Sequence, residues 1–273
     1  MNKSLFIFLG LISVLFIGSC METKRNGKGN GEPLDIESLL NAAARCPNRY
    51  QCPPWDSLLT LAEQPGDTVL LSVLGEKMKN LEINPHRGIG PLIPRLLSAW
   101  LQYQGEGLTA VQQNTLEALM MEAARSSANY RQEAYRALGW IRSEEVMDFL
   151  IGEVQNEANR SPESREAAAE VLGSMLKTLE LPRKWLNSSD VWLKEMAVVL
   201  IDQMDFSSNQ EALQQADELL KGTALSPATE KEVILRVLNL LILIDEPEFK
   251  PVFQKLQAHP DPDVRLLARK GLE

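Results

Sequence analysis

Ser174 and Lys177 have the spacing of a serine nucleophile and the lysine that activates it. In such chemistry the lysine withdraws the hydroxyl proton, and nearby donors stabilise the oxyanion. The two motifs that accompany this pair elsewhere, S-D-N and K-T-G, do not occur in the chain. The pair also directly follows Leu172 and Gly173 in a helix-like pattern of apolar residues. We therefore interpret it as a chance match on a helix surface.

Few other groups in the sequence are suited to catalysis. There are two histidines, His86 and His259, and neither H-E-x-x-H nor G-x-S-x-G is present, so a metal centre or a catalytic triad has little to be built from. Asp261 and Asp263 could bind calcium, but Asp261 before Pro262 better fits a helix start. We expect no catalytic residue, no metal and no cofactor, and hence a protein that is not an enzyme.

Cys20 stands at the end of the most apolar run in the chain. Residues 1–19 carry Lys3 as their single charged side chain, and residues 5–17 are mostly Leu, Ile, Phe and Val. Thirteen residues are short for a membrane-spanning helix but fit the apolar region of a signal peptide. Gly18 and Ser19 supply the small residues that precede a cleavage site. A signal peptide at 1–19 is therefore predicted.

The sequence Ile17-Gly18-Ser19-Cys20 resembles the lipobox of bacterial lipoproteins. The resemblance implies that Cys20 becomes the first residue of the mature chain and carries lipid such as palmitate. It places the protein in the bacterial cell envelope, with the outer membrane favoured because Met21, and not Asp, follows. An ordinary signal peptide with a chance cysteine, or an uncleaved anchor, are the alternatives.

The segment after Cys20 is predicted to be a flexible tether. Residues 21–33 are mainly Gly, Asn, Lys, Arg and Glu and cannot bury enough apolar surface to fold. Their typical end-to-end reach is about 20 Å.

Without residues 1–19 the chain has 27 basic and 37 acidic residues. This acidity argues against nucleic acid as a partner, since such binding needs clustered positive charge.

The two remaining cysteines, Cys46 and Cys52, lie in a segment interrupted by Pro47. An exported chain permits disulfides, and an even number remains once Cys20 is set aside. A disulfide is therefore the favoured interpretation. Two buried thiols, or half of a zinc site, are the alternatives.

Beyond residue 34 the apolar residues recur at three and four positions, which is typical of helices. RQEAYRALG (131–139) and REAAAEVLG (165–173) share one pattern, and DVRLLARKGL (263–272), KEMAVVLI (194–201) and KEVILRVL (231–238) keep parts of it. The small alanine would let a neighbouring helix approach, and the basic head would reach an acid or a carbonyl in the adjacent repeat. The repeat-defining residues are Arg131, Ala134, Leu138, Arg165, Ala168, Leu172, Lys194, Ala197, Arg265, Ala268 and Leu272.

The C-terminal residues HPDPDVRLLARKGLE resemble the HEAT family, especially the short bacterial form named after phycobilisome lyases. A tetratricopeptide array matches less well. The resemblance implies an all-α, right-handed solenoid of HEAT-like helical pairs over 109–273, preceded at 34–108 by an irregular helical cap or degenerate repeats. Thr109 and Ser161 are predicted to cap helices, Gly222 to end one and Ser226 to start another.

Stacked repeats of this kind present an extended concave surface to partners. The resemblance therefore implies a membrane-anchored, non-catalytic scaffold or assembly factor that binds an unidentified envelope protein. Trp185 and Trp192 flank a break in the helical pattern and could contact that partner or fill the core. A ligand- or cell-wall-binding lipoprotein and a lyase-like enzyme are the alternatives.

Overall fold

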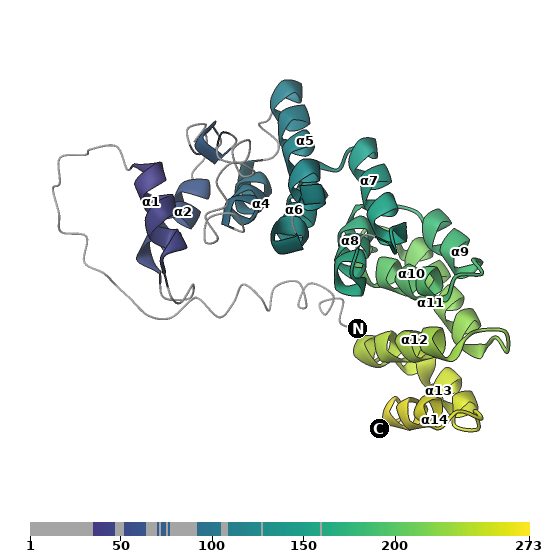
Figure 1. Cartoon of the computed structure of the whole chain (residues 1–273). Coiled ribbons are helices and arrows are strands. Elements are labelled where there is room, and N and C mark those ends of the chain that lie inside the picture. The colour runs from purple at the N-terminus through teal and green to yellow at the C-terminus, as the bar shows by residue number, and fades with distance from the viewer. Residues whose placement is uncertain are drawn as a thin grey trace. The chain divides into compact units, whose positions relative to one another are not determined.

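The computed structural model describes residues 35–46, 52–63, 70, 72–74, 76, 92–104, 109–126, 128–158 and 160–273 (Figure 1). The chain divides into two units, Met1–Leu34 and Asp35–Glu273, and every described residue belongs to the second. The predictions for the signal peptide, Cys20 and the tether lie outside the described residues, as does His86.

Regular structure in the described residues is helical throughout, with no strand. The elements are α1 (Ile36–Ala44), α2 (Pro53–Ala62), α4 (Leu92–Gln104), α5 (Ala110–Ser126), α6 (Ala128–Ile141), α7 (Glu144–Gln155), α8 (Pro162–Met175), α9 (Glu180–Leu186), α10 (Val191–Gln203), α11 (Gln210–Leu225), α12 (Lys231–Ile244), η3 (Pro247–Phe249), α13 (Lys250–Leu256) and α14 (Pro262–Lys270).

Consecutive helices pack in pairs: α5 with α6, α7 with α8, α9 with α10, α11 with α12 and α13 with α14 (Figure 1). The second helix of each pair also contacts the second helix of the next pair, from α6 to α14. Such stacking buries the apolar face that a single pair leaves open. The fold is therefore an all-α solenoid of helical pairs, as predicted. The region before residue 109 continues this order, since α2 contacts α4 and α4 contacts α6.

The small residues of the repeat pattern allow the second helices to approach closely. Ala134 and Ala168 are fully buried, as are Leu138 and Leu172 one turn further along. A Cβ atom added to Gly173 would lie 2.7 Å from the carbonyl oxygen of Leu200 on α10, which is closer than real Cβ contacts. The L-G ending of the repeat thus fixes how near α8 and α10 can lie.

Two of the predicted helix caps are present. The Thr109 amide donates to the Gln112 side chain (3.0 Å), and the Gln112 amide donates to the Thr109 hydroxyl (3.3 Å). The Ser161 hydroxyl accepts from the Ser164 amide, with Pro162 in the first turn of α8.

Two other predicted helix boundaries are wrong. α11 does not end at Gly222 but runs to Leu225, because Ala224 still lies on its buried face. Ser226 is the C-cap of α11 and does not start a helix, since α12 begins at Lys231 after Glu230.

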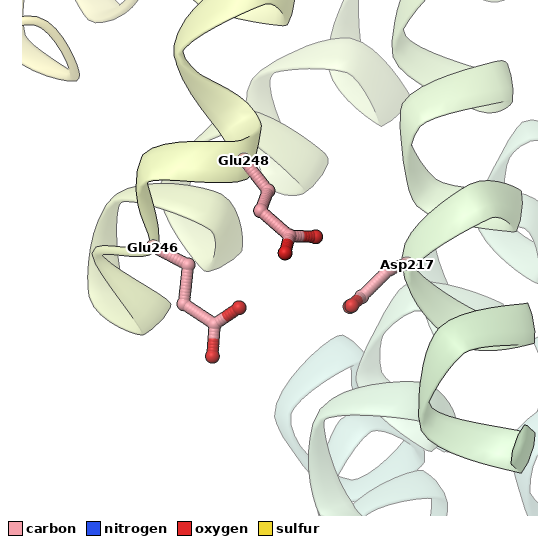
Figure 2. Close-up of side chains that lie close together, drawn as sticks. All are labelled: Asp217, Glu246 and Glu248. Carbon is pink, nitrogen blue, oxygen red and sulfur yellow. The ribbon is translucent and has the colours of Figure 1, made fainter. Parts of the chain in front are cut away.

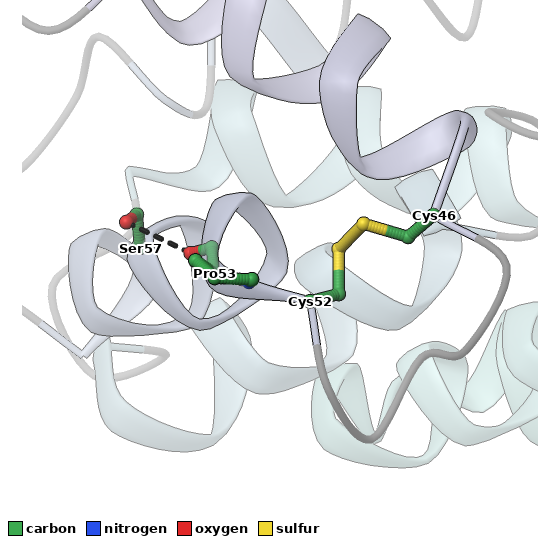
Figure 3. The surroundings of a disulfide bond; sticks show 4 residues. All are labelled: Cys46, Cys52, Pro53 and Ser57. Carbon is green, nitrogen blue, oxygen red and sulfur yellow. Dashed lines mark hydrogen bonds between the residues drawn. A yellow bond between two sulfur atoms is a disulfide. The ribbon is translucent and has the colours of Figure 1, made fainter.

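The structure contains the predicted disulfide between Cys46 and Cys52, whose Cα atoms are 5.9 Å apart (Figure 3). Cys46 follows the C-cap of α1 and Cys52 is the N-cap residue of α2. Pro53 then occupies the first turn of α2, where its carbonyl accepts from the Ser57 hydroxyl (3.0 Å). The disulfide therefore joins the end of one helix to the beginning of its packing partner.

Candidate functional site

The repeat arginines bind carbonyl groups within their own helical pair. Arg131 of α6 donates through Nε to the Ala124 carbonyl of α5 at 2.8 Å, and Arg165 of α8 donates to the Val154 carbonyl of α7 at 2.7 Å. Arg265 of α14 donates to the His259 carbonyl in the turn after α13, also at 2.7 Å. The expectation that these heads find an acid or a carbonyl in an adjacent repeat is therefore wrong, although the Arg165 guanidinium also touches a ring of the next pair. Arg131 and Arg165 satisfy carbonyls that the end of a helix leaves without a partner, and Arg265 satisfies one in the turn that follows.

Lysines at the corresponding positions point to the next pair. Lys194 of α10 binds both carboxylate oxygens of Glu230, the N-cap residue of α12, at 2.7 and 2.9 Å. Lys231 of α12 binds Asp263 (2.6 Å) and Asp261 (3.1 Å) at the start of α14. A lysine in this position therefore links successive repeats, as expected from the sequence.

The two tryptophans lie in different environments. Trp185 of α9 is 2% exposed, so its ring is part of the core and offers no surface to a partner. Trp192 of α10 is half-buried, and the Arg165 guanidinium lies over its ring at 4.6 Å. Its indole nitrogen is buried without a hydrogen-bond partner in the described part of the chain.

A buried polar network joins α6 to the turn after α7. The Tyr135 hydroxyl donates to Glu153 at 2.5 Å, and Arg160 binds the same carboxylate through both Nε and Nη2. Burial, followed by the hydrogen bond to Glu153, raises the pKa of Tyr135 far above its usual value. The negative charge of Glu153 is balanced by the positive charge of Arg160, and Tyr135 donates a further hydrogen bond. A buried network that is balanced in this way suits a structural role. No sequence motif marks them.

Ser174 and Lys177 do not form a reactive pair in the structure. The Ser174 hydroxyl donates to the Val171 carbonyl one turn earlier on α8 (2.7 Å), and α8 ends at Met175, before Lys177. Asp261 caps α14 by accepting from the amides of Asp263 and Val264, as predicted.

An acidic face runs along the second helices. We give this name to Glu166 and Glu170 of α8, Glu195 and Asp202 of α10 and Glu232 of α12, together with Arg136 of α6 and Arg236 of α12.

Arg236 is the central cation of the acidic face. It binds Glu166 at 2.6 Å and approaches Glu195 at 3.5 Å, so one side chain of α12 reaches over α10 to α8. Burial is the main cause that raises the pKa of both Glu170 and Glu195, and neighbouring carboxylates add to it. Five carboxylates thus face two guanidinium groups on a partly desolvated surface, and one of these, that of Arg136, is also bound to Glu133 at 2.9 Å.

A groove of about 580 Å³ opens between α9 and α11. Its rim carries polar side chains from both helices, including Arg183, Asn187, Gln215 and Glu218, and its inner wall includes Leu219. We call it the α9–α11 groove.

A carboxylate cluster lies where η3 meets α11. Asp217, Glu246 and Glu248 place carboxylate oxygens within 4.8 Å of one another, and Figure 2 shows them turned toward a common space. Burial, followed by the charge of Glu246, raises the pKa of Asp217 to about 6. Lys221 approaches Glu248 at 3.8 Å and partly balances the charge. Three carboxylates in this geometry suit a hard cation such as calcium or magnesium.

No helix in the described residues is long and apolar enough to cross a membrane. No family model matches the sequence, and no curated protein matches it. The resemblances to lipoproteins and to phycobilisome-lyase-type repeats therefore stay predictions.

A solved structure of human deoxyhypusine hydroxylase, in complex with glycerol, is similar at 12% identity and a TM-score of 0.34. The match covers 87% of this chain and 94% of that one. The hydroxylase is an enzyme, so the comparison contradicts the expectation that the chain is not an enzyme, and we carry that expectation no further. A likeness at this level in turn assigns no activity to the chain.

Proposed function

We propose that this chain is a lipid-anchored repeat protein of the bacterial envelope that binds another protein through its acidic face. The anchor is inferred from the lipobox-like Ile17-Gly18-Ser19-Cys20 and from the predicted tether that follows it. Stacked helical pairs give an extended surface of the kind that repeat proteins use for binding.

The unbalanced charge of the acidic face is the observation that carries the proposal. Carboxylates held close together and partly out of water are costly in the ionised form, and burial accordingly raises the pKa of Glu170 and Glu195. A basic surface on a partner would supply the missing cations. Complementary charge of this kind speeds association and selects the partner, and its effect weakens with salt.

The test is cross-linking in living cells with the full-length chain, followed by purification and mass spectrometry. The double substitution Glu170→Lys/Asp202→Lys reverses two exposed charges of the acidic face. Its matched control, Glu122→Lys/Asp148→Lys, makes the same change in charge on exposed positions of α5 and α7.

The expected result is one stoichiometric partner that is lost with the first double variant and kept with the second. Equal recovery from both variants, or no partner above background, would overturn the proposed role of the acidic face. Cys20→Ser tests the anchor separately, since it should release the protein from the membrane fraction and abolish labelling by a palmitate analogue.

A further inference from the structure

The α9–α11 groove exists because the two helices differ in length. α9 has seven residues and α11 has sixteen, so α9 does not cover the full length of its neighbour. The uncovered side of α11 carries Gln215, Glu218, Leu219 and Gly222, spaced by three and four residues along one side of the helix. The groove is thus a regular gap between first helices of successive pairs.

The lining combines an apolar wall with groups that donate and accept hydrogen bonds. Leu186 and Leu219, both partly buried, supply apolar surface, and Val233 lies fully buried beneath them. Asn187 and Gln215 carry side-chain amides that already donate to the Arg183 carbonyl (2.9 Å) and to Glu211 (3.2 Å). Each amide keeps a second N–H and acceptor capacity for a ligand, and Thr229 adds a hydroxyl. This mixture matches the alternating N–H and C=O groups of an extended peptide backbone.

The size of the groove fits a short peptide segment. From Gln215 to Ser226 the lining follows eleven residues of α11, which is about 16 Å of helix. An extended chain rises about 3.3 Å per residue, so about five residues would span that length. A volume of about 580 Å³ also lies within the range of known ligand sites.

Arg183 gives the groove a charge preference. Its side chain is exposed at the rim, and among the described residues it makes one long hydrogen bond, 3.4 Å from Nη2 to Gln215. A guanidinium has five donors and binds carboxylates in a bidentate fashion. Lys194, the other cation of the lining, is already bound to Glu230, and Glu218 is an exposed carboxylate one turn along α11 from Gln215. The preference for an acidic group therefore holds at the Arg183 end of the groove.

We propose that the α9–α11 groove binds an extended peptide segment of a partner protein, with an acidic side chain of that segment on Arg183. This inference rests on the proposed protein-binding function and adds a second, separate contact to the acidic face. The peptide backbone would lie along α11 and bond to the amides of Asn187 and Gln215.

Gly222 allows the groove to be blocked without disturbing the fold. A Cβ atom at Gly222 meets nothing within 4 Å, and the residue lies inside a helix, where glycine is unfavourable. Gly222→Trp should therefore fill the groove. Gly152 of α7 is equally open and exposed but lies elsewhere, so Gly152→Trp is the matched control.

The experiment selects binders from a library of random heptapeptides on the full-length chain in detergent. We expect enriched peptides that contain an acidic residue and lose at least tenfold in affinity for Gly222→Trp but not for Gly152→Trp. Arg183→Gln should lower the affinity for the acidic peptide. The same peptide with its acid replaced by the amide should bind more weakly to the wild type, and Arg183→Gln should not change its affinity. Thermal denaturation checks that all variants remain folded.

The inference would be overturned by a selection that enriches no peptide, or by enriched peptides that bind the Gly222→Trp variant as well as the wild type. Binding of N-acetylated glucosamine trisaccharide that Gly222→Trp abolishes, without peptide binding, would also overturn it and assign the groove to glycans. The result is separable from the proposed function. Suppose that the partner cross-links in cells to the Gly222→Trp variant as well as to the wild type. The proposed role of the acidic face would then be kept, and the proposed role of the groove would be rejected.

Discussion

The repeats that carry arginine and the repeats that carry lysine use one sequence position in opposite ways. In α6, α8 and α14 the arginine bonds backward to a carbonyl at the end of the preceding helix or in the turn after it. In α10 and α12 the lysine bonds forward to an acid at the start of the next second helix. The planar guanidinium with its Nε donor suits a buried carbonyl, whereas the ammonium suits a carboxylate at the surface. Arginine therefore closes a pair and lysine joins two pairs.

The largest expected effect is at Arg165, where the arginine type is most buried. Arg165→Ala removes the bond to the Val154 carbonyl and the contact with the Trp192 ring. A buried carbonyl without a partner and a lost cation–π contact together should lower the free energy of unfolding by about 3 kcal/mol. Urea denaturation measures the loss. The comparison predicts that Arg165→Lys recovers only part of it, and full recovery would show that the two residues are interchangeable here.

The second largest loss of stability is expected at Gly173, where an arginine-type repeat meets a lysine-type repeat between α8 and α10. Gly173→Ala forces a Cβ atom against the Leu200 carbonyl and the Cβ of Gln203 (2.7 and 2.9 Å), so the helices must separate. We expect a loss of about 2 kcal/mol in urea denaturation. Gly139→Ala is the control, because the nearest atom there is Cγ1 of the Val171 side chain, which can move. Equal losses would mean that this junction is no tighter than the one between α6 and α8.

A smaller effect is expected at Lys194, which represents the lysine type. Lys194→Met breaks the link to Glu230 and should cost about 0.5 kcal/mol at pH 7, since the pair is partly exposed.

The loss at Lys194 should depend on pH. The Lys194 hydrogen bond holds the pKa of Glu230 below its ordinary value of 4.5, so the stabilisation is present above that value and disappears as the pH falls below it. Denaturation at pH 7 and at pH 3 measures the difference. Lys255→Met, on an exposed position of α13, should show no such trend.

The last expected effect differs in sign, because it is a gain in stability in the lysine-type region. Asp217 has a folded pKa of about 6 against 3.8 for the free side chain, so the folded state holds the proton more tightly. The stability of the wild type should therefore fall as the pH rises from about 4 to about 6. Asp217→Asn should raise the unfolding free energy by about 1 kcal/mol at pH 7, after allowance for solvent screening, and little at pH 4.

Thermal denaturation at pH 4 and pH 7 tests the Asp217 prediction. Asp148→Asn on α7, outside the carboxylate cluster, should leave the stability unchanged at both values. A loss at pH 7 with Asp217→Asn would show that the cluster is stabilised by a bound cation, and addition of a chelator to the wild type would then have the same effect.

The sequence predicted the helical repeats because each copy carries its own periodic apolar face, as in Ala134 with Leu138 and Ala168 with Leu172. The disulfide was also predictable, from two cysteines on either side of a proline. Sequence reasoning placed the hydrogen-bond acceptor of Arg165 in the wrong repeat, because spacing along one helix does not say which neighbour offers a carbonyl.

The candidate binding features left no signal in the sequence. Arg236 and Glu166 are 70 residues apart, and the carboxylates of Asp217 and Glu246 meet only because η3 packs near α11. The α9–α11 groove depends on the shortness of α9. The sequence marks the break that ends α9, between Trp185 and Trp192, but not that α11 lies beside it. Such features depend on how distant helices stack, and a pattern within one helix carries no information on that.

The bond from Arg236 to Glu166 has a mechanical consequence. In a repeat array each unit contacts only its immediate neighbours. Bending the array therefore changes the distance between a unit and the next but one at little cost in free energy. Arg236 ties α12 to α8 across α10 and so fixes that spacing at one point. This ion pair therefore adds stiffness to the stretch from α8 to α12, and because it is partly exposed, added salt or a competing cation would weaken that contribution.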